Sequence, residues 1–232
     1  MSRIFLTGDM HGELGYKRFS SKNWSAGKLL SSNDFLIVLG DFGILWDLHE
    51  SKTELYLKKW FNNKPWTTLF IDGNHENFER LNKLETTAFL GGKVGIVTNS
   101  IFHLKRGEIY TINNKTFLCI GGAKSYDKHL RMENISWWKE EELNFSEQQH
   151  VMEQLENHKY TVDNILAHTL PETVTKQFGY TLSGHSDSCS VRKFLDYIIQ
   201  TTKFQNLWCG HWHDERNSGK FHVLYNNIVE IT

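Results

Sequence analysis

The chain has 232 residues, of which 39% are hydrophobic, and its eight tryptophans supply ample material for a folded core. The formal net charge of −1 lacks the basic excess of a nucleic-acid-binding surface, which argues against nucleic acid as a partner. The longest apolar run, Phe35–Leu39, is too short to cross a bilayer, and no signal-like stretch is visible, so we expect no membrane association. Three cysteines without a Cys-x-x-Cys pair are typical of reduced thiols and predict a cytoplasmic location.

Strand and helix signals alternate over residues 1–90. Apolar, β-branched or aromatic runs predict buried strands at residues 3–7, 34–39 and 67–72. Between the last two runs, residues 51–62 carry leucine and aromatic side chains among lysines and predict a helix. This alternation is typical of the α/β class.

The rest of the chain adds a strand-rich stretch and then more helices. Residues 94–122 predict strands, with turns at Arg106-Gly107 and Asn113-Asn114. Ser146 and Gln149 predict a capping box for the helix that follows. We find no convincing linker and expect residues 1–232 to form a single domain. The remaining elements are expected, in chain order, as a helix at 146–158, a strand at 164–166, a helix at 191–203, a strand at 206–209 and a closing hairpin of 222–225 with 228–231.

Five of the predicted strands are each followed by a short motif rich in side chains that bind metals. Because ligands gather outside the carboxyl ends of strands in open α/β sheets, we expect these loops to form one site. Carboxylate and amide oxygens with imidazole nitrogens suit divalent first-row metals, and the set exceeds the four ligands of one tetrahedral ion. It predicts a pair of ions about 3.5–4 Å apart, as in phosphoryl hydrolases. The motifs are Gly8-Asp9-Met10-His11-Gly12, Gly40-Asp41, Gly73-Asn74-His75-Glu76, Ala167-His168 and Gly210-His211-Trp212-His213.

The ordered series Asp-x-His, Gly-Asp, Gly-Asn-His-Glu, His and Gly-His-x-His resembles the bacterial-type members of the calcineurin-like metallophosphoesterase superfamily, from Gly8 to His213. The resemblance implies a four-layer αββα sandwich of two mixed β-sheets flanked by helices. It also implies a role for each of eight residues. Asp9, His11 and His213 match the ligands of one ion, Asn74, His168 and His211 match those of the second, Asp41 matches the bridging carboxylate, and His75 matches the catalytic histidine.

The activity implied by this resemblance is the hydrolysis of phosphate esters by a hydroxide that bridges two metal ions, with His75 assisting the leaving group. Two divalent ions are the expected cofactors. Manganese is the first choice because the ligands are rich in oxygen, and iron, zinc and nickel are alternatives. Glu76 or Asp47 is a candidate to orient His75. Cys209 beside the last motif is either an adventitious soft ligand or, as we favour, a buried strand cysteine.

The segment 122–145 is loop-like and mixes cationic with aromatic side chains. One interpretation is a lid or insert in which Lys128 or Arg131 contacts phosphoryl oxygens, with Arg131 as the candidate substrate-binding residue because its guanidinium is bidentate. The other is an ordinary surface loop. The segment Ser183–Ser190 poses the same choice, and its composition favours a plain loop. Histidines outside the motifs are expected at the surface or in packing: His49, His103, His129, His150, His158, His185 and His222.

The substrate class rests on one departure from a related group of enzymes. In Ser/Thr protein phosphatases an Asp-Arg-Gly sequence follows the second motif, and its arginine contacts phosphate. Here Gly40-Asp41 runs into residues 42–47 without an arginine. We therefore expect a phosphorylated small molecule or nucleotide as substrate, with phosphoprotein as the alternative. A non-catalytic scaffold for protein partners is disfavoured, because all eight motif positions are retained.

Overall fold

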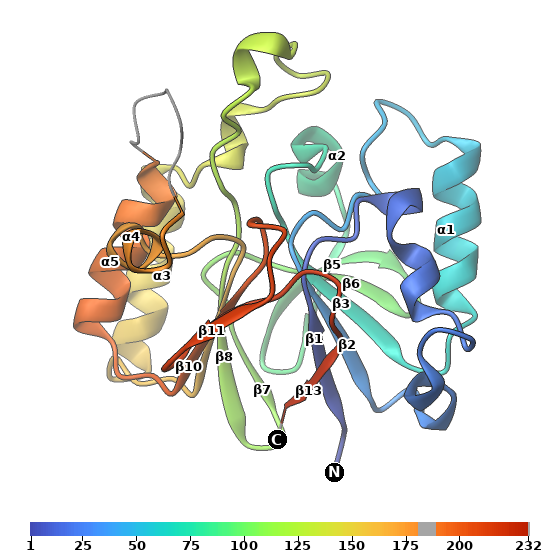
Figure 1. The fold of residues 1–232 in the computed structure, drawn as a ribbon, viewed down its shortest axis with the longest axis horizontal. Helices are drawn as coiled ribbons and strands as arrows, with labels where there is room; N and C mark the ends of the chain where they lie inside the picture. The colour runs from blue at the N-terminus through green and yellow to red at the C-terminus, as the bar shows by residue number, and fades with distance from the viewer. Residues whose placement is uncertain (181–188, 232) are drawn as a thin grey trace.

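Two β-sheets pack face to face and are covered by helices on both outer sides (Figure 1). The computed structural model describes residues 1–180 and 189–231. Its strands are β1 (Ile4–Thr7), β2 (Phe35–Leu39), β3 (Thr67–Ile71), β4 (Thr86–Phe89), β5 (Gly92–Thr98), β6 (Ile101–Leu104), β7 (Ile109–Ile112), β8 (Lys115–Ile120), β9 (Asn164–Ala167), β10 (Asn206–Cys209), β11 (Arg216–Ser218), β12 (Phe221–Val223) and β13 (Val229–Ile231). Its α-helices are α1 (Lys52–Asn62), α2 (Phe78–Asn82), α3 (Phe145–Asn157), α4 (Glu172–Gln177) and α5 (Ser190–Thr201).

The two sheets form the middle of a four-layer sandwich. The seven-stranded sheet has the order β13-β1-β2-β3-β6-β5-β4, and the six-stranded sheet has the order β11-β12-β10-β9-β8-β7. Helices α1 and α2 lie outside the first sheet, and α3, α4 and α5 lie outside the second (Figure 1). Both sheets mix parallel and antiparallel pairs. The expected α/β fold, an αββα sandwich of two mixed sheets, is confirmed.

Strand β2 shows why the sequences of the central strands are unbroken apolar runs. Ile37 and Leu39 point into the layer between the two sheets, whereas Leu36 and Val38 pack in the cluster that contains α1. Successive side chains of a strand face opposite sides, so a strand covered on both sides needs apolar residues throughout. All five residues of β2 are buried.

Three neighbouring strands of each sheet run parallel and end at the same edge of the molecule. In the first sheet β1 pairs with β2 and β2 with β3 in parallel. In the second sheet β8 pairs with β9 and β9 with β10 in parallel. The loops after these strands leave the sheets together at the top of Figure 1, where they form the candidate site.

Most of the expected local elements are found. Helices α1 and α5 lie within one or two residues of the ranges predicted for them. Asn113 and Asn114 form the two-residue turn between β7 and β8, both with positive φ (53° and 62°). The Arg106-Gly107 turn is also present, closed by a bond from the Glu108 N–H to the Lys105 carbonyl. The segment 181–188, which includes His185, lies outside the described residues, so the prediction for Ser183–Ser190 is not tested there.

The capping box of α3 is not the predicted one. The side chain of Asn144 accepts a hydrogen bond from the Glu147 N–H, and the Glu147 side chain accepts one from the Asn144 N–H. The prediction of Ser146 and Gln149 was therefore wrong by two residues. Asparagine caps helices as well as serine does, and Glu147 has a further partner in Arg106.

The closing hairpin was also predicted wrongly. Strand β12 pairs with β10 and β11 in the six-stranded sheet, whereas β13 pairs antiparallel with β1 in the seven-stranded sheet. Residues Asn226-Asn227 therefore lead from one sheet to the other. Local turn signals cannot reveal this, because the reason is the free edge of β1, which a distant strand must cover.

The described part of the chain contains no helix that is both long and apolar enough to span a bilayer.

Candidate metal centre

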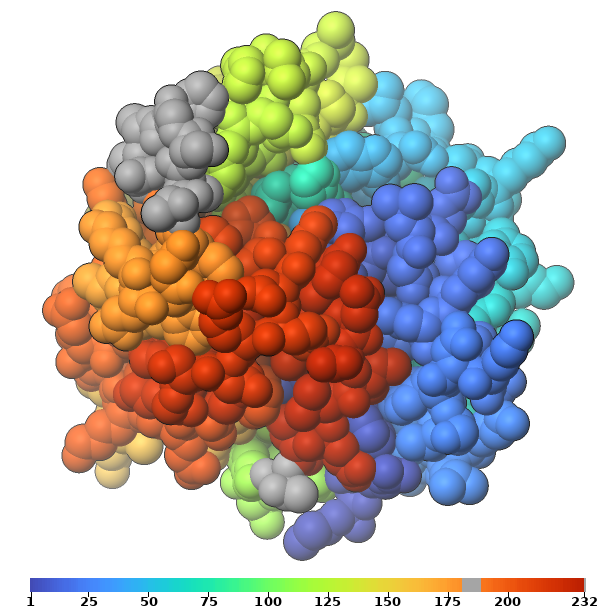
Figure 2. Space-filling view, in the orientation of Figure 1, coloured from blue at the N-terminus to red at the C-terminus, as the bar shows by residue number. Residues whose placement is uncertain are grey.

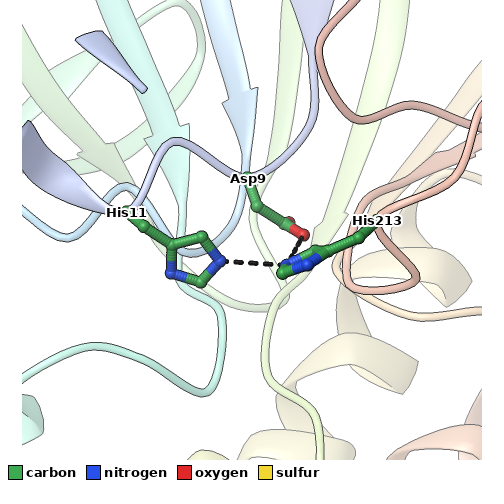
Figure 3. A group of neighbouring side chains, drawn as sticks. All are labelled: Asp9, His11 and His213. Carbon is green, nitrogen blue, oxygen red and sulfur yellow. Dashed lines mark hydrogen bonds and ion pairs between the residues drawn. The ribbon is translucent and has the colours of Figure 1, made fainter. Parts of the chain in front are cut away.

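Asp9, His11 and His213 place their ligand atoms together just beyond the end of β1 (Figure 3). The Nε2 atoms of the two histidines are 3.0 Å apart, and His213 Nε2 is 3.1 Å from an Asp9 carboxylate oxygen. Asp9 and His11 leave the first sheet, whereas His213 follows β10 of the second. A carboxylate oxygen and two imidazole nitrogens at these distances form a donor set suited to a divalent cation.

A second cluster shares Asp9 and adds Asp41 and His168, all three buried. The Nδ1 atom of His168 donates to the Leu39 carbonyl oxygen at 2.7 Å, so Nε2 is the nitrogen that faces the ligand cluster. That Nε2 lies 3.4 Å from Asp41, and Nδ1 lies 3.7 Å from Asp9. A histidine held through Nδ1 in this way would offer Nε2 to a metal ion in exchange for its proton.

Electrostatics around His168 favour positive charge at this point. Burial lowers the pKa of His168, but the charges of Asp41 and Asp9 outweigh burial and raise it to about 9. Burial alone would raise the pKa of Asp41, but the charge and hydrogen bond of His168, together with the charges of His75 and His11, hold the pKa well below its ordinary value. Two buried carboxylates around one imidazole thus form a pocket that attracts cations.

Asn74 and His211 complete the set of predicted ligands. The Asn74 amide oxygen is 3.2 Å from His168 Nε2, and the ring centres of His168 and His211 are 5.0 Å apart. The backbone N–H of His211 donates to both carboxylate oxygens of Asp9, at 2.9 and 3.0 Å. The fold therefore brings together all seven residues expected from the sequence as metal ligands, three from the second sheet and four from the first.

Four of these seven residues have a left-handed backbone. The φ angles are 51° at His11, 49° at Asp41, 69° at His211 and 46° at His213. Outside glycine this conformation is uncommon, although Asp and His adopt it more often than most residues. It turns each side chain sharply at the end of its strand. Conformations of this kind persist where surrounding structure holds them, and they cluster at functional sites.

Two glycines allow the two sheets to approach each other here. A Cβ atom on Gly40 would collide with the His168 ring, and one on Gly210 would collide with the Asp9 carboxylate. Gly40 follows β2, and Gly210 follows β10. Each glycine thus leaves room for a ligand side chain from the opposite sheet.

His75 lies beside the ligand cluster. Its backbone N–H donates to Asp41 at 2.7 Å, and its ring centre is 5.3 Å from that of His11. Burial lowers the pKa of His75, although the charge of Asp41 opposes this effect. The ring lies at the edge of the cluster, and its nitrogens face the guanidinium of Arg131.

Neither acidic residue considered for orienting His75 performs that role among the described contacts. The Glu76 carboxylate accepts the Phe42 N–H at 2.8 Å, which supports the Asp41 loop. Burial raises the pKa of Glu76 well above its ordinary value. Asp47 contributes its carbonyl oxygen to Arg80. The sequence offered no signal for the actual neighbour, Arg131, because 56 positions separate it from His75.

The sequence pattern of the calcineurin-like phosphoesterase family matches residues 2–215. The chain belongs to this family. Among curated proteins, no significant match was found. Family membership and the convergent donor set together make this protein a metal-dependent phosphoesterase in broad class.

In this phosphoesterase the segment 122–145 stands over the upper rim of the molecule, shown in yellow-green in Figure 2. Arg131 reaches back from it, with its terminal nitrogens 3.1 and 3.3 Å from the two ring nitrogens of His75. Asp127 and the Ser136 carbonyl also accept from its guanidinium. Lys128, the other candidate cation, lies over the Trp137 ring at 5.0 Å. Of the two predicted phosphate contacts, Arg131 is the one beside the site.

A cavity of about 390 Å³ opens beside His11 and His75. Its wall includes three acidic residues and several apolar ones, and among the described residues no lysine or arginine lines it. The acidic residues are Glu13, Asp47 and Glu54, and the apolar ones are Leu14, Ile44, Trp46 and Leu57. Its size falls in the usual range for small-ligand sites. A substrate bound at the phosphoesterase centre can therefore extend an organic group into this space.

The remaining histidines and Cys209 lie outside the ligand clusters of the described structure. His103 is buried and contacts Asp72 at 3.1 Å, and His222 stacks on Trp208. Cys209 is fully buried in the core under the helices of the second sheet, which supports its interpretation as a strand cysteine. The others are exposed or partly buried: His49, His129, His150 and His158.

Proposed function

We propose that this protein is a dinuclear metal-dependent hydrolase of phosphate esters that acts on small phosphoesters or nucleotides. The observation that carries the proposal is the convergence of seven ligand-type side chains from both sheets, with the Asp41 carboxylate 3.7 Å from His11 on one side and 3.4 Å from His168 on the other. One ion would be held by the Asp9 cluster, which is Asp9, His11 and His213. The other would be held by the Asn74 cluster, which is Asn74, His168 and His211. Asp41 lies between the two clusters.

The metal ions, His75 and Arg131 would have different roles in the hydrolysis. Bound divalent ions would lower the pKa of water and neutralise charge on phosphoryl oxygens. His75, held by Asp41 through its backbone and facing Arg131, would protonate or hydrogen-bond the leaving oxygen. Arg131 would contact the phosphoryl oxygens as substrate binds. Manganese is the first candidate ion because the cluster contains oxygen ligands from Asp9, Asp41 and Asn74, with iron, zinc or nickel as alternatives.

The shape and charge of the cavity support a small substrate. Its space suits one organic group, and the negative charges of Glu13 and Asp47, which line it, would repel further phosphates. The net charge of −1 also gives no attraction to nucleic acid. A phosphoprotein remains the second candidate, because Leu130, Met132 and Ile135 are exposed on the segment beside the site and offer apolar contacts to a peptide. A non-catalytic scaffold has less support, because all seven ligand-type residues and His75 are present.

Metal titration tests the dinuclear centre. Protein stripped with a chelator should lose phosphoesterase activity and regain it with two equivalents of manganese. Asp41→Asn should lower both metal occupancy and turnover, whereas His49→Asn, at an exposed histidine outside the clusters, should change neither. Full activity with a single bound ion would rule out the dinuclear proposal.

A substrate panel tests the substrate class. We expect a higher kcat/KM for small phosphate monoesters, phosphodiesters or nucleotides than for phosphopeptides or DNA. Phosphopeptide turnover at least tenfold more efficient than that of any small ester, on the order of 1.4 kcal/mol in transition-state binding, would favour the protein phosphatase alternative.

We also propose that residues 1–232 work as one domain in the cytoplasm, with 122–145 as its lid or insert. The sequence pattern of the family spans both sheets. The three cysteines are free and buried, which supports a reducing compartment.

A further inference from the structure

The side-chain amide of Asn74 is hydrogen-bonded to Ser125 through its nitrogen. Its amide nitrogen donates to the Ser125 hydroxyl oxygen at 3.0 Å, while its amide oxygen faces His168 at 3.2 Å. Both residues are buried. Asn74 follows β3 of one sheet, and Ser125 follows β8 of the other, so this bond crosses between the sheets.

The orientation of this amide decides whether Asn74 can bind a cation. Oxygen and nitrogen of a side-chain amide are nearly equal in size, and rotation by half a turn exchanges them. In the observed orientation the oxygen points toward His168 and the ligand cluster. In the reversed orientation the NH₂ group would point there, and it has no lone pair for a metal ion.

Glu141 fixes the direction of the bond. Its carboxylate accepts the backbone N–H of Ser125 at 3.2 Å and also bonds to the Ser125 hydroxyl. In its ionised form the Glu141 carboxylate is an acceptor only, so the Ser125 hydroxyl then donates to Glu141 and accepts from Asn74. Reversing the Asn74 amide would set its oxygen against the hydroxyl oxygen of Ser125, without a hydrogen between them.

The same contacts anchor the base of the segment that carries Arg131. Glu141 also accepts the backbone N–H of Trp138, at 3.5 Å, and the Trp138 side chain is buried. Glu141 is therefore bonded to the residues on both sides of 126–137, and it holds the two ends of this segment together. Ser125 and Glu141 thus support both the Asn74 side chain and the segment that places Arg131 against His75.

We propose that Ser125 is a positioning residue that, with Glu141 behind it, keeps the Asn74 amide oxygen directed at the metal site. This inference rests on the proposed dinuclear function. It assigns Ser125 a role in the affinity for one ion, the one held by Asn74, His168 and His211. The Asp9, His11 and His213 cluster has no contact with Ser125 among the described residues and should bind its ion as before.

Manganese binding measured by calorimetry tests this role without reference to turnover. Ser125→Ala should weaken one of the two binding steps by about 10–100-fold, the usual effect of removing a group that orients a ligand, and leave the other step unchanged. Ser125→Thr keeps the hydroxyl and should restore most of the affinity. Ser136→Ala, on the same segment but without a contact to Asn74, is the matched control and should bind both ions like wild type.

A double-mutant cycle separates orientation from general support. In an Asn74→Asp background the side chain presents an oxygen whichever way it is turned. Ser125→Ala should then weaken metal binding by less than about threefold, within the additivity expected of uncoupled sites. An equal loss in both backgrounds would mean that Ser125 merely supports the loop, and it would overturn the proposal.

Two failures are distinguishable in these titrations. Wild-type protein that binds a single ion, or that lacks phosphoesterase activity with two, would refute the proposed function itself. Wild-type protein that binds two ions and is active, together with Ser125→Ala binding both ions equally tightly, would refute only the role of Ser125.

Discussion

The guanidinium group of Arg131 lies against the imidazole ring of His75, with its terminal nitrogens 3.1 and 3.3 Å from the two ring nitrogens. Burial lowers the pKa of His75, and the positive charge of Arg131 lowers it further, although the charge of Asp41 opposes both. A phosphate group entering the site would supply the acceptor oxygens that the guanidinium here lacks on its His75 side. The contact therefore joins the expected substrate-binding residue to the expected catalytic residue.

Arg131→Ala should lower kcat/KM for a small phosphate ester by roughly 10²-fold, a typical effect of removing one donor to a charged transition state, and leave two metal ions bound. Arg131→Lys should recover only part of the loss, because an ammonium group lacks the bidentate geometry. Steady-state kinetics with metal analysis measures both. Lys139→Ala, an exposed cation on the same segment, is the control. If the Arg131→Ala variant has the kinetics of wild type, the segment 122–145 is an ordinary surface loop.

His75→Ala should retain both metal ions and lose about 10²–10⁴-fold in kcat, the usual size of a general-acid contribution. The reason is its position beside the ligand cluster, with its ring nitrogens directed at Arg131. Metal content and kcat should be measured on the same samples. If the variant loses metal while turnover per bound metal pair stays the same, His75 is a ligand and its catalytic assignment is wrong.

Stability should depend on pH through Glu141. Burial raises the pKa of Glu141 to about 7 from an ordinary value of 4.5. Its stabilising contribution is therefore complete below pH 4.5 and is lost as the pH rises through 7. Glu141→Gln cannot titrate, so the stability of the variant relative to wild type should rise by roughly 1–3 kcal/mol between pH 4 and pH 8. Urea unfolding in chelator measures the difference. Exposed Glu140→Gln is the control, and a difference independent of pH would contradict the prediction.

Arg106→Met should destabilise the protein by about 3–5 kcal/mol, because it leaves the buried Asp72 carboxylate without its main partner. Arg106 also contacts Glu147 of the α3 capping box, so this residue links the end of β3 to the start of α3. Asp72→Asn should restore part of the loss in the Arg106→Met background, since it removes the unpaired charge. Urea unfolding of the single and double variants checks this. Additive losses would show that charge is not the cause.

The positions of the candidate ligands were predictable from the sequence for a physical reason. Asp9, Asp41 and His168 each follow a short run of buried residues that local pattern alone marks as a strand. Parallel neighbouring strands end at one edge, so their loops must meet there. The assignment of His211 and His213 to different ions came from family resemblance, and the spacing of these residues could not provide it.

Contacts between distant segments were not predictable in the same way. Nothing in the local sequence places Arg131 on His75 or Ser125 on Asn74, because both contacts depend on how residues 122–145 return to the sheets. Strand β13 was misassigned for a related reason, since its partner β1 lies at the other end of the chain. Local patterns predict elements, whereas these contacts arise from the way the elements pack.

The left-handed backbone at His11, Asp41, His211 and His213 affects how substitutions at these positions should be interpreted. Alanine would remove the ligand atom and also disfavour the backbone turn, so its effect would combine two losses. Asparagine tolerates this conformation better than most residues do and lacks an imidazole or a charge. Asparagine scanning would therefore measure the loss of the imidazole at the three histidines and the loss of the charge at Asp41. The excess loss on alanine would measure how strongly each loop depends on its own residue to turn.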